Sequence, residues 1–338
     1  MYLGIRSLVS VLLVVLLSQC SPTNQAEIYL SGPTMGTVYN IKYVPNGNIE
    51  SAKLQQEIDS ALLQVNKLMS TYMADSELSR FNQWHSTEPF PLSPQTLKVM
   101  EEAKRLGALS KGVLDVTVGP LVNLWGFGPE ARPEKTPSEE LVANVKARTG
   151  LDKLLLTTTS ASKTEPTLYV DLSTIAKGYG VDLVAELLDE HHIVNYLVEI
   201  GGEMRLSGKK INGADWRVAI EKPITQERAV ERIISVGNNG IATSGDYRNY
   251  FEVDGVRYSH LIDPSTGKPI THNLVSVTVV DPSCMTADGL ATALSIMGKD
   301  KALALAAENQ IAVLLITKEG DEFKEYTSPM FDKIVTEY

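Results

Sequence analysis

The spacing of apolar residues along the chain predicts several amphipathic helices. The first carries Leu54, Ile58 and Leu62 four positions apart, which places them on one face of a helix. A serine or threonine followed by proline marks two further helix starts, at Ser93 and Thr136. On these signals helices are expected over residues 54–69, 93–110, 136–150, 174–191 and 286–297.

Alternating apolar and polar residues predict many strands. They fall at residues 37–44, 154–158, 167–172, 196–200, 216–220, 232–236, 250–253, 275–280, 311–317 and 322–326. Several follow one another through short turns such as the Asp254-Gly255 pair, which favours mostly antiparallel sheets packed with helices, an α+β fold. A Rossmann fold is not expected, because no strand leads into a Gly-x-Gly-x-x-Gly turn, and Lys177 lacks the spacing of a P-loop lysine.

The first residues are typical of an export signal. The apolar run over residues 11–17 is too short to span a membrane, and Cys20 follows it directly after "LSQ". We therefore expect a lipoprotein signal at residues 1–19, an acylated Cys20, a polar tether to residue 30 and one domain over residues 31–335. Ordinary signal cleavage and an uncleaved anchor are the alternatives, since Gln19 is not the small residue expected before such a cysteine.

The charge argues against a nucleic-acid-binding protein, and the cysteine content argues against a domain stabilised by disulfides. The formal net charge is −10, with 31 Lys and Arg against 41 Asp and Glu, which argues against a nucleic-acid partner. Cys284 is the only cysteine besides Cys20. If Cys20 is acylated, no intramolecular disulfide can form, so the domain must be held by its core.

Asp288 and Thr292 stand four residues apart in a predicted helix, so both side chains lie on the same face. A carboxylate beside a hydroxyl offers hard oxygen ligands, which suit Mg²⁺ or Ca²⁺ and not zinc. The spacing leaves a second interpretation open, in which Thr286 or Asp288 caps the first turn of this helix.

A predicted strand ends at Asp171, and the helix that follows offers free N–H groups and a positive dipole end to an anion. Lys177 adds a cation one turn later, and Gly178 and Gly180 leave room for a planar ligand or for another segment of backbone. The alternative is an ordinary strand-to-helix turn capped by Asp171 or Ser173.

His260 precedes a turn over residues 263–267 in the stretch "YSHLIDPSTGKPI". A histidine that lies near an oxygen-liganded metal without binding it can act as a general base. A partly buried histidine that bonds a carbonyl of the turn is the alternative, and the residues alone leave both open. The sequence lacks the Gly-x-Ser-x-Gly elbow and the cysteine–histidine pairing that would indicate other hydrolases.

Three further motifs have two interpretations each. The Gly201-Gly202 pair indicates a tight turn between strands or, less simply, a phosphate cradle. Residues 243–245, "TSG", are either an anion-binding segment or a polar loop. Trp125 and Phe127 stand between glycines, a pattern more typical of a core than of a cofactor site.

Taken in order, nine segments closely resemble the ApbE family of bacterial FAD:protein FMN transferases. They are "GPTMGTVYNI", "STYMADSELSRFN", "LDVTVGPLVNLWGFG", "VDLSTIAKGYGVD", "YLVEIGGEM", "WRVAIEKP", "IATSGDYRNYF", "SHLIDPSTGKPI" and "MTADGLATAL". The resemblance runs from about residue 30 to residue 332. It implies the α+β fold of that family.

The resemblance also implies an activity. Family members bind FAD and Mg²⁺, transfer the FMN half to a threonine or serine hydroxyl of an acceptor protein, and release AMP. The implied acceptors are subunits of the sodium-translocating NADH:quinone oxidoreductase or related electron-transport complexes, met at the periplasmic side of the inner membrane, where lipid on Cys20 would anchor the chain. A Mg²⁺-dependent FAD pyrophosphatase and a non-enzymatic FAD-binding lipoprotein are the alternatives.

The resemblance assigns roles to individual residues. It implies that FAD is contacted by Met35, Tyr72, Val113, Leu114, Asp115, Asp171, Lys177 and Ile262. Mg²⁺ would be held by the side chains of Asp288 and Thr292 and by the backbone carbonyl oxygen of Thr174. His260 would be the base that accepts the proton of the incoming hydroxyl.

Overall fold

The computed structural model of the chain describes residues 26–47, 49–128, 136–223, 230–245, 250–253 and 256–338. Its helices are α1 (Ser51–Met69), α2 (Glu77–Gln83), α3 (Pro94–Leu109), α4 (Gly119–Leu124), α5 (Glu139–Lys146), α6 (Ala176–Glu190), α7 (Cys284–Met297), α8 (Lys299–Glu308) and α9 (Pro329–Ile334), with a 3-10 turn at Leu151–Lys153. The predicted signal, Cys20 and the Asp254-Gly255 turn lie outside the described residues. None of the helices in the described ranges is long and apolar enough to cross a membrane.

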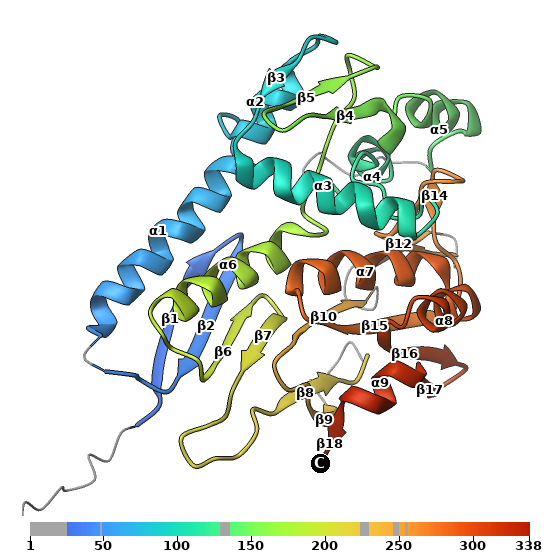
Figure 1. Ribbon diagram of the computed structural model, residues 1–338. Helices are drawn as coiled ribbons and strands as arrows, with labels where there is room; N and C mark the ends of the chain where they lie inside the picture. Colours follow the sequence, from blue (N-terminus) through green and yellow to red (C-terminus); the bar gives the residue numbers. More distant parts are fainter. Residues whose placement is uncertain (1–25, 48, 129–135, 224–229, 246–249, 254–255) are drawn as a thin grey trace, which may run out of the picture.

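Eight strands form one sheet in the order β1-β2-β6-β7-β10-β15-β16-β17, and every neighbouring pair is antiparallel (Figure 1). These strands are β1 (Ile28–Thr34), β2 (Thr37–Tyr43), β6 (Tyr196–Ile200), β7 (Glu203–Ser207), β10 (Gly240–Gly245), β15 (Leu274–Asp281), β16 (Ala312–Glu319) and β17 (Glu322–Thr327). The predicted α+β fold of antiparallel sheets and helices is confirmed. Strand β1 begins within the segment expected to be a tether.

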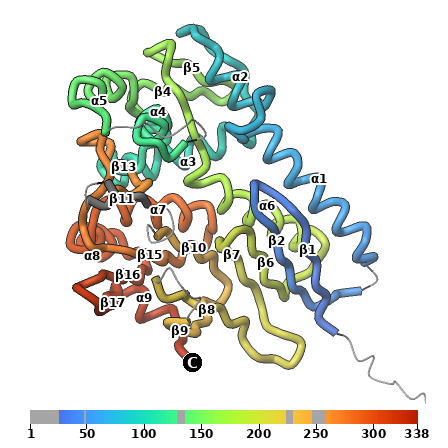
Figure 2. Tube along the Cα trace, turned by 180° about the vertical axis from the view of Figure 1, so that it is seen from behind, coloured from blue at the N-terminus to red at the C-terminus, as the bar shows by residue number. Residues whose placement is uncertain are grey.

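The remaining strands form four small antiparallel sheets. They are β3 (Phe90–Pro91), β4 (Leu154–Leu156), β5 (Ser160–Lys163), β8 (Val218–Glu221), β9 (Val230–Ser235), β11 (Tyr250–Val253), β12 (Val256–Ser259), β13 (Ile262–Asp263), β14 (Lys268–Pro269) and β18 (Thr336–Glu337). Seen from behind, β8 and β9 lie together with α9 near the C-terminus (Figure 2).

The middle of the large sheet is covered on both faces. Successive strand residues point to opposite faces, so Val279 of β15 and Leu315 of β16 pack with α7, whereas Val280 and Leu314 pack with β8, β9 and α9. Burial on both faces explains why β15 and β16 are nearly continuous apolar runs and not alternating ones.

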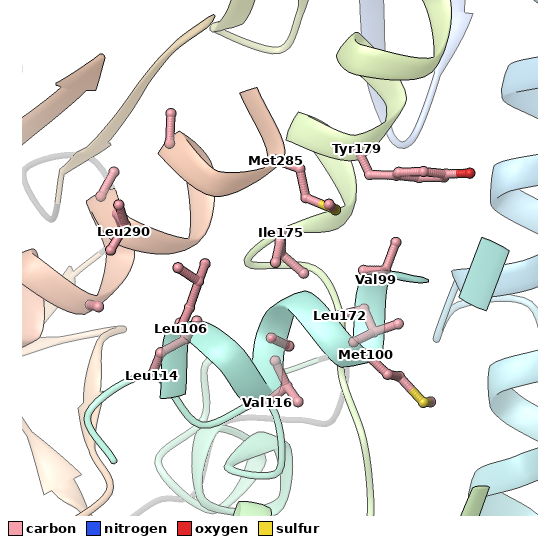
Figure 3. Close-up of a cluster of buried hydrophobic side chains, with 14 of the residues drawn as sticks. Val99, Met100, Leu106, Leu114, Val116, Leu172, Ile175, Tyr179, Met285 and Leu290 are labelled. Atoms are coloured by element: carbon pink, nitrogen blue, oxygen red, sulfur yellow. The ribbon is translucent and has the colours of Figure 1, made fainter. Parts of the chain in front are cut away.

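Helices α6 and α7 lie over one face of the sheet, and α3 packs against α7. Leu106 of α3, Ile175 before α6 and Leu290 of α7 meet in one buried cluster (Figure 3). Gly289 allows this close packing, because a Cβ there would lie 2.5 Å from Leu106 Cδ1. Each such buried side chain contributes about 1.5–3 kcal/mol, so the cluster fixes how α6 and α7 cross.

One predicted element is wrong in type, and the helix predicted over residues 136–150 is shorter at both ends, Glu139–Lys146. Residues 167–172 are not a strand, because the N–H and C=O of Val170 bond the side chain of Asn82, both at 2.8 Å, and not a neighbouring strand. The helix expected to start at Thr136 starts at Glu139, where Ser138 accepts a bond from the Leu141 N–H. The missing strand and the later helix start both arise because polar side chains close to the segment satisfy the backbone.

Lys163 on β5 gives a prediction about stability. Its ammonium is buried, donates to the Asn82 carbonyl at 3.1 Å and lies 4.6 Å from the Phe81 ring centre. Burial lowers its pKa from 10.5 to about 8. Between these values the unfolded chain binds more protons than the folded chain, so Lys163 makes the free energy of unfolding rise with pH.

We therefore expect the wild-type chain to gain about 3 kcal/mol of unfolding free energy relative to a Lys163→Met variant as the pH rises through this window. Urea unfolding of both proteins on either side of the window measures the difference, and all other titrating groups cancel in the comparison. A difference that does not change with pH would contradict the lowered pKa.

Candidate active site

Two cavities adjoin beside the start of α6. The central cavity has a volume of about 320 Å³, and the side cavity one of about 460 Å³. Asp171, Ser173 and Lys177 line both cavities, so they meet along the segment that leads into α6. An elongated ligand can therefore occupy both while passing the same lysine and aspartate.

Every residue that the sequence analysis assigned to the site lines one of these cavities. The central cavity is lined by Val113, Leu114, Asp115, Asp171, Thr174, Lys177, His260, Ile262, Asp288 and Thr292, among others. Met35 and Tyr72 line the side cavity, which also includes Asp171 and Lys177. These residues come from segments far apart in the sequence, so their convergence is a property of the tertiary fold.

Met35 and Tyr72 shape the side cavity. Met35 occupies the turn between β1 and β2 with a positive φ of 47°, and it packs on Gly180, where a Cβ would lie 2.8 Å from the methionine Cε. Gly180 therefore makes room for Met35 and not for a ligand. The Tyr72 side chain is 81% exposed at the rim, where its ring can stack on a planar group.

Helices α6 and α7 cross closely at Gly178. A Cβ at this position would lie 2.4 Å from the Cys284 carbonyl oxygen, so a side chain cannot fit. The Gly178 N–H donates to Asp288 Oδ2 at 2.9 Å. The sequence left two uses open for this glycine, room for a planar ligand or for another backbone. The structure shows the second use: the backbone of α7, the helix that carries Asp288, packs against Gly178.

Asp182 holds the N-terminus of α7 in place, a role the sequence analysis missed. Its buried carboxylate accepts from the Cys284 and Met285 N–H groups, both at 3.0 Å, and from Ser283 Oγ at 2.7 Å. Arg205 pairs with the same carboxylate at 3.0 Å. A negative group at a helix N-terminus is stabilising, so α6 fixes the start of the helix that carries Asp288.

Ser283 is the N-cap of α7, because its Oγ accepts from the Thr286 N–H at 3.2 Å. The alternative interpretation, in which Thr286 or Asp288 caps this helix, is therefore wrong. Thr286 instead donates its hydroxyl to Glu102 at 2.6 Å. Asp288 and Thr292 are left to face the central cavity from one side of α7.

Lys177, Glu203 and Asp288 form a buried charged cluster on the central cavity. Lys177 Nζ lies 2.5 Å from Glu203 Oε1. Burial, and then the charge of Asp288, raise the pKa of Glu203 to about 7, and burial raises the pKa of Asp288 against the opposing effect of Lys177. Burial alone would lower the pKa of Lys177, but the two carboxylates outweigh it and raise it. Lys177 is therefore an ion-pair partner and not a solvated cation.

The oxygens around this cluster fit a hard metal ion. Thr174 Oγ1 and Glu203 Oε2 are buried without a hydrogen-bond partner, and Thr292 lines the same cavity as Asp288. Buried oxygen atoms with unused lone pairs are the donors that Mg²⁺ prefers. Within the described ranges no three or more His, Cys, Asp or Glu side chains are grouped so that they could hold a metal ion, so a metal here would need threonine or backbone oxygens among its ligands.

His260 is partly buried and lines the central cavity beside Phe127, whose ring meets the imidazole edge-on at 6.4 Å between centroids. Trp125 stacks on Tyr258 at 5.7 Å and donates its indole N–H to the Gly267 carbonyl at 2.8 Å. Trp125 therefore holds the chain on both sides of His260. The interpretation of Trp125 as a core residue is confirmed by its burial.

Two other motifs have defined places in the structure. Gly201 and Gly202 form the turn between β6 and β7 with φ values of 61° and 111°, as expected for a tight turn between strands. Thr243, Ser244 and Gly245 belong to β10 and not to a loop, yet they line the central cavity. Glu203, just after the glycine turn, is a site residue that no spacing pattern indicated.

Comparison with known proteins shows the family of this chain. The ApbE family profile matches residues 35–315. The chain belongs to the ApbE family. It is 58% identical over 325 residues to the FAD:protein FMN transferase of Vibrio cholerae serotype O1, a match that covers 96% of this chain and 97% of that protein.

Two solved structures of the ApbE family superimpose closely on this member. The flavin transferase ApbE from Vibrio cholerae has a TM-score of 0.85 and 57% identity, with 92% of this chain and 99% of that chain covered. The apo form of the Pseudomonas stutzeri flavinyl transferase ApbE has a TM-score of 0.85 and 41% identity, with 92% and 97% covered. This ApbE-family protein is an enzyme of the transferase class.

Proposed function

We propose that this ApbE-family protein transfers FMN from FAD to a threonine or serine hydroxyl of an acceptor protein, with Mg²⁺, and releases AMP. The observation that carries the proposal is the junction of the two cavities, where Asp171 and Lys177 line both and His260, Asp288 and Thr174 stand in the central one. The relatives in Vibrio cholerae and Haemophilus influenzae are FAD:protein FMN transferases, which supports the same reaction.

The reaction exchanges the phosphoanhydride bond of FAD for a phosphate ester bond to the acceptor. The acceptor oxygen attacks the phosphorus of the FMN half, the bond from that phosphorus to the bridging oxygen breaks, and AMP leaves with the bridging oxygen. His260 takes the proton of the attacking hydroxyl, which is a poor nucleophile without such a base. Lys177 provides a fixed positive charge where the two cavities meet, close to a pyrophosphate that spans them.

Asp288, Thr292 and Thr174 would hold the Mg²⁺ ion on the central cavity. When bound, the ion would neutralise the phosphate oxygens and the charge that develops on the leaving AMP. Tyr72 and Met35 would receive one of the two planar ends of FAD in the side cavity. Val113, Leu114 and Ile262 provide apolar surface for the other end in the central cavity.

The decisive experiment mixes residues 21–338 with FAD, Mg²⁺ and a purified acceptor domain, and examines the acceptor band on a denaturing gel for flavin fluorescence. Fluorescence that disappears with EDTA supports the proposal. A dark acceptor band together with free FMN and AMP would identify a FAD pyrophosphatase instead. A dark band with intact FAD, repeated with several acceptor domains, would identify a FAD-binding protein without transferase activity.

Glu203 gives a prediction about the metal. We expect Glu203→Gln to weaken Mg²⁺ binding by about tenfold, because the change removes a buried negative charge close to Asp288 and leaves Lys177 to offset the charge of Asp288 alone. Titration calorimetry with Mg²⁺ measures the change. Glu199→Gln, on the neighbouring strand and outside both cavities, is the matched control. Unchanged Mg²⁺ affinity in the Glu203 variant would contradict the prediction.

We further propose that lipid on Cys20 anchors the protein at the periplasmic side of the inner membrane, where the acceptors would be subunits of the sodium-translocating NADH:quinone oxidoreductase or related complexes. The apolar run before Cys20 supports this location. A Cys20→Ser variant should appear in the soluble periplasmic fraction. Its retention in the membrane fraction would point to an uncleaved anchor.

A further inference from the structure

A third cavity, lined by four lysines, opens beside the central one. We call it the lysine recess; it has a volume of about 860 Å³, and its lysines are Lys104, Lys111, Lys146 and Lys153. They come from α3 and the turn after it, from α5 and from the 3-10 turn. No residue of the recess other than Asp115 is implied in FAD or metal binding by the family resemblance.

Three of the four lysines are held in place by the backbone. Lys104 donates to the Leu154 carbonyl, Lys146 to the Ser265 carbonyl and Lys153 to the Thr149 carbonyl, and these three side chains are partly buried. A carbonyl uses one ammonium hydrogen and leaves the charge uncompensated, so each lysine keeps donors for a ligand. Because three ammonium groups are held in fixed positions, they can bind one anionic ligand together, which freely moving lysines on the surface do less well.

The recess has a positive balance in an acidic protein. Its carboxylates are Asp115 and Asp152, against four lysines, whereas the whole chain has a net charge of −10. Asp115 already accepts bonds from the Thr117 N–H at 2.8 Å and hydroxyl at 2.6 Å. A local reversal of the overall sign of charge attracts anionic groups, whereas the acidic remainder of the surface repels them.

The recess is continuous with the site. Asp115 and Pro264 line both the recess and the central cavity. Ser265, whose carbonyl accepts from Lys146, is in the turn that follows His260. A peptide that presents a hydroxyl to His260 and continues past this turn would place its neighbouring residues in the recess.

We propose that the lysine recess binds an acidic segment of the acceptor protein next to the threonine or serine that receives FMN. This inference rests on the proposed function for the identity of the partner. The volume exceeds what a single carboxylate fills, and the spread of the lysines over three elements suits a short peptide with more than one acidic side chain.

The test uses two fluorescent peptides of equal length with one threonine each, one with aspartates beside the threonine and the other with asparagines at the same positions. Binding is measured by anisotropy, and transfer from FAD by mass spectrometry. The variants are Lys111→Glu and Lys104→Gln/Lys153→Gln, with Lys301→Glu on α8 as a control that lines none of the three cavities.

We expect the recess variants to weaken binding of the aspartate peptide by about tenfold and to leave the asparagine peptide and FAD affinity unchanged. Higher salt should weaken the aspartate peptide selectively in the wild-type protein. Equal losses for both peptides, no loss, or a loss of FAD affinity would overturn the inference. If the aspartate peptide binds through the lysines but is never flavinylated, the recess stands and the proposed transferase reaction fails.

Discussion

Replacing His260 with alanine should lower the rate of flavin transfer by about 10²–10⁴-fold while leaving FAD bound. The imidazole lines the central cavity at its junction with the turn 263–267, and Trp125 fixes the chain on both sides of it. Removing the ring takes away a proton acceptor, and Leu261, Ile262 and Pro264 still line the cavity beside it. The rate loss should therefore appear in kcat and not in the KM for FAD.

Single-turnover transfer, followed by fluorescence of the acceptor band, measures the effect, and fluorescence quenching of FAD measures its binding. Added imidazole should restore part of the rate of His260→Ala, a result that a purely structural role does not give. His85→Ala is the control, since that histidine is exposed after α2 and lines neither cavity. Full transfer by His260→Ala would exclude the histidine as the base.

Replacing Asp288 with asparagine should lower transfer by at least about 100-fold and abolish the dependence on Mg²⁺. Asparagine keeps the size of the side chain and an oxygen that can accept from the Gly178 N–H, so the α6–α7 crossing survives. What the variant lacks is the negative charge for the metal. Burial raises the pKa of Asp288 despite the opposing charge of Lys177, so the folded chain disfavours the charged carboxylate.

The same substitution should accordingly raise or preserve thermal stability in EDTA, while activity falls. A fall in activity without a fall in thermal stability distinguishes loss of the metal from loss of the fold. Differential scanning calorimetry with and without Mg²⁺ measures the thermal stability. Asp300→Asn on α8, where the carboxylate is largely exposed, is the control for the effect of removing one negative charge. Asp288→Asn that keeps Mg²⁺-dependent transfer would mean that the metal lies elsewhere.

Local patterns in the sequence were enough for most elements and part of the site. The apolar spacing of α1, the Ser93-Pro94 start of α3 and the β16–β17 hairpin appear in the structure close to their predicted bounds. The four-residue interval of Asp288 and Thr292 put both on one cavity, because a helix turns once every 3.6 residues whatever it packs against. The resemblance supplied the residues whose positions no spacing relates, such as Met35 and His260.

The sequence by itself therefore determined the α+β fold, the main helices and strands, and part of the lining of the two cavities. Only the tertiary structure decided the order of the eight strands, the use of Gly178 as a helix crossing, and the pairing of Lys177 with Glu203. The physical reason is distance along the chain: Asp182 bonds α7 from about one hundred residues away, and the lysine recess joins three separate elements. Periodicity reports only which face of an element is apolar, whereas buried ion pairs and charged cavities depend on which elements meet.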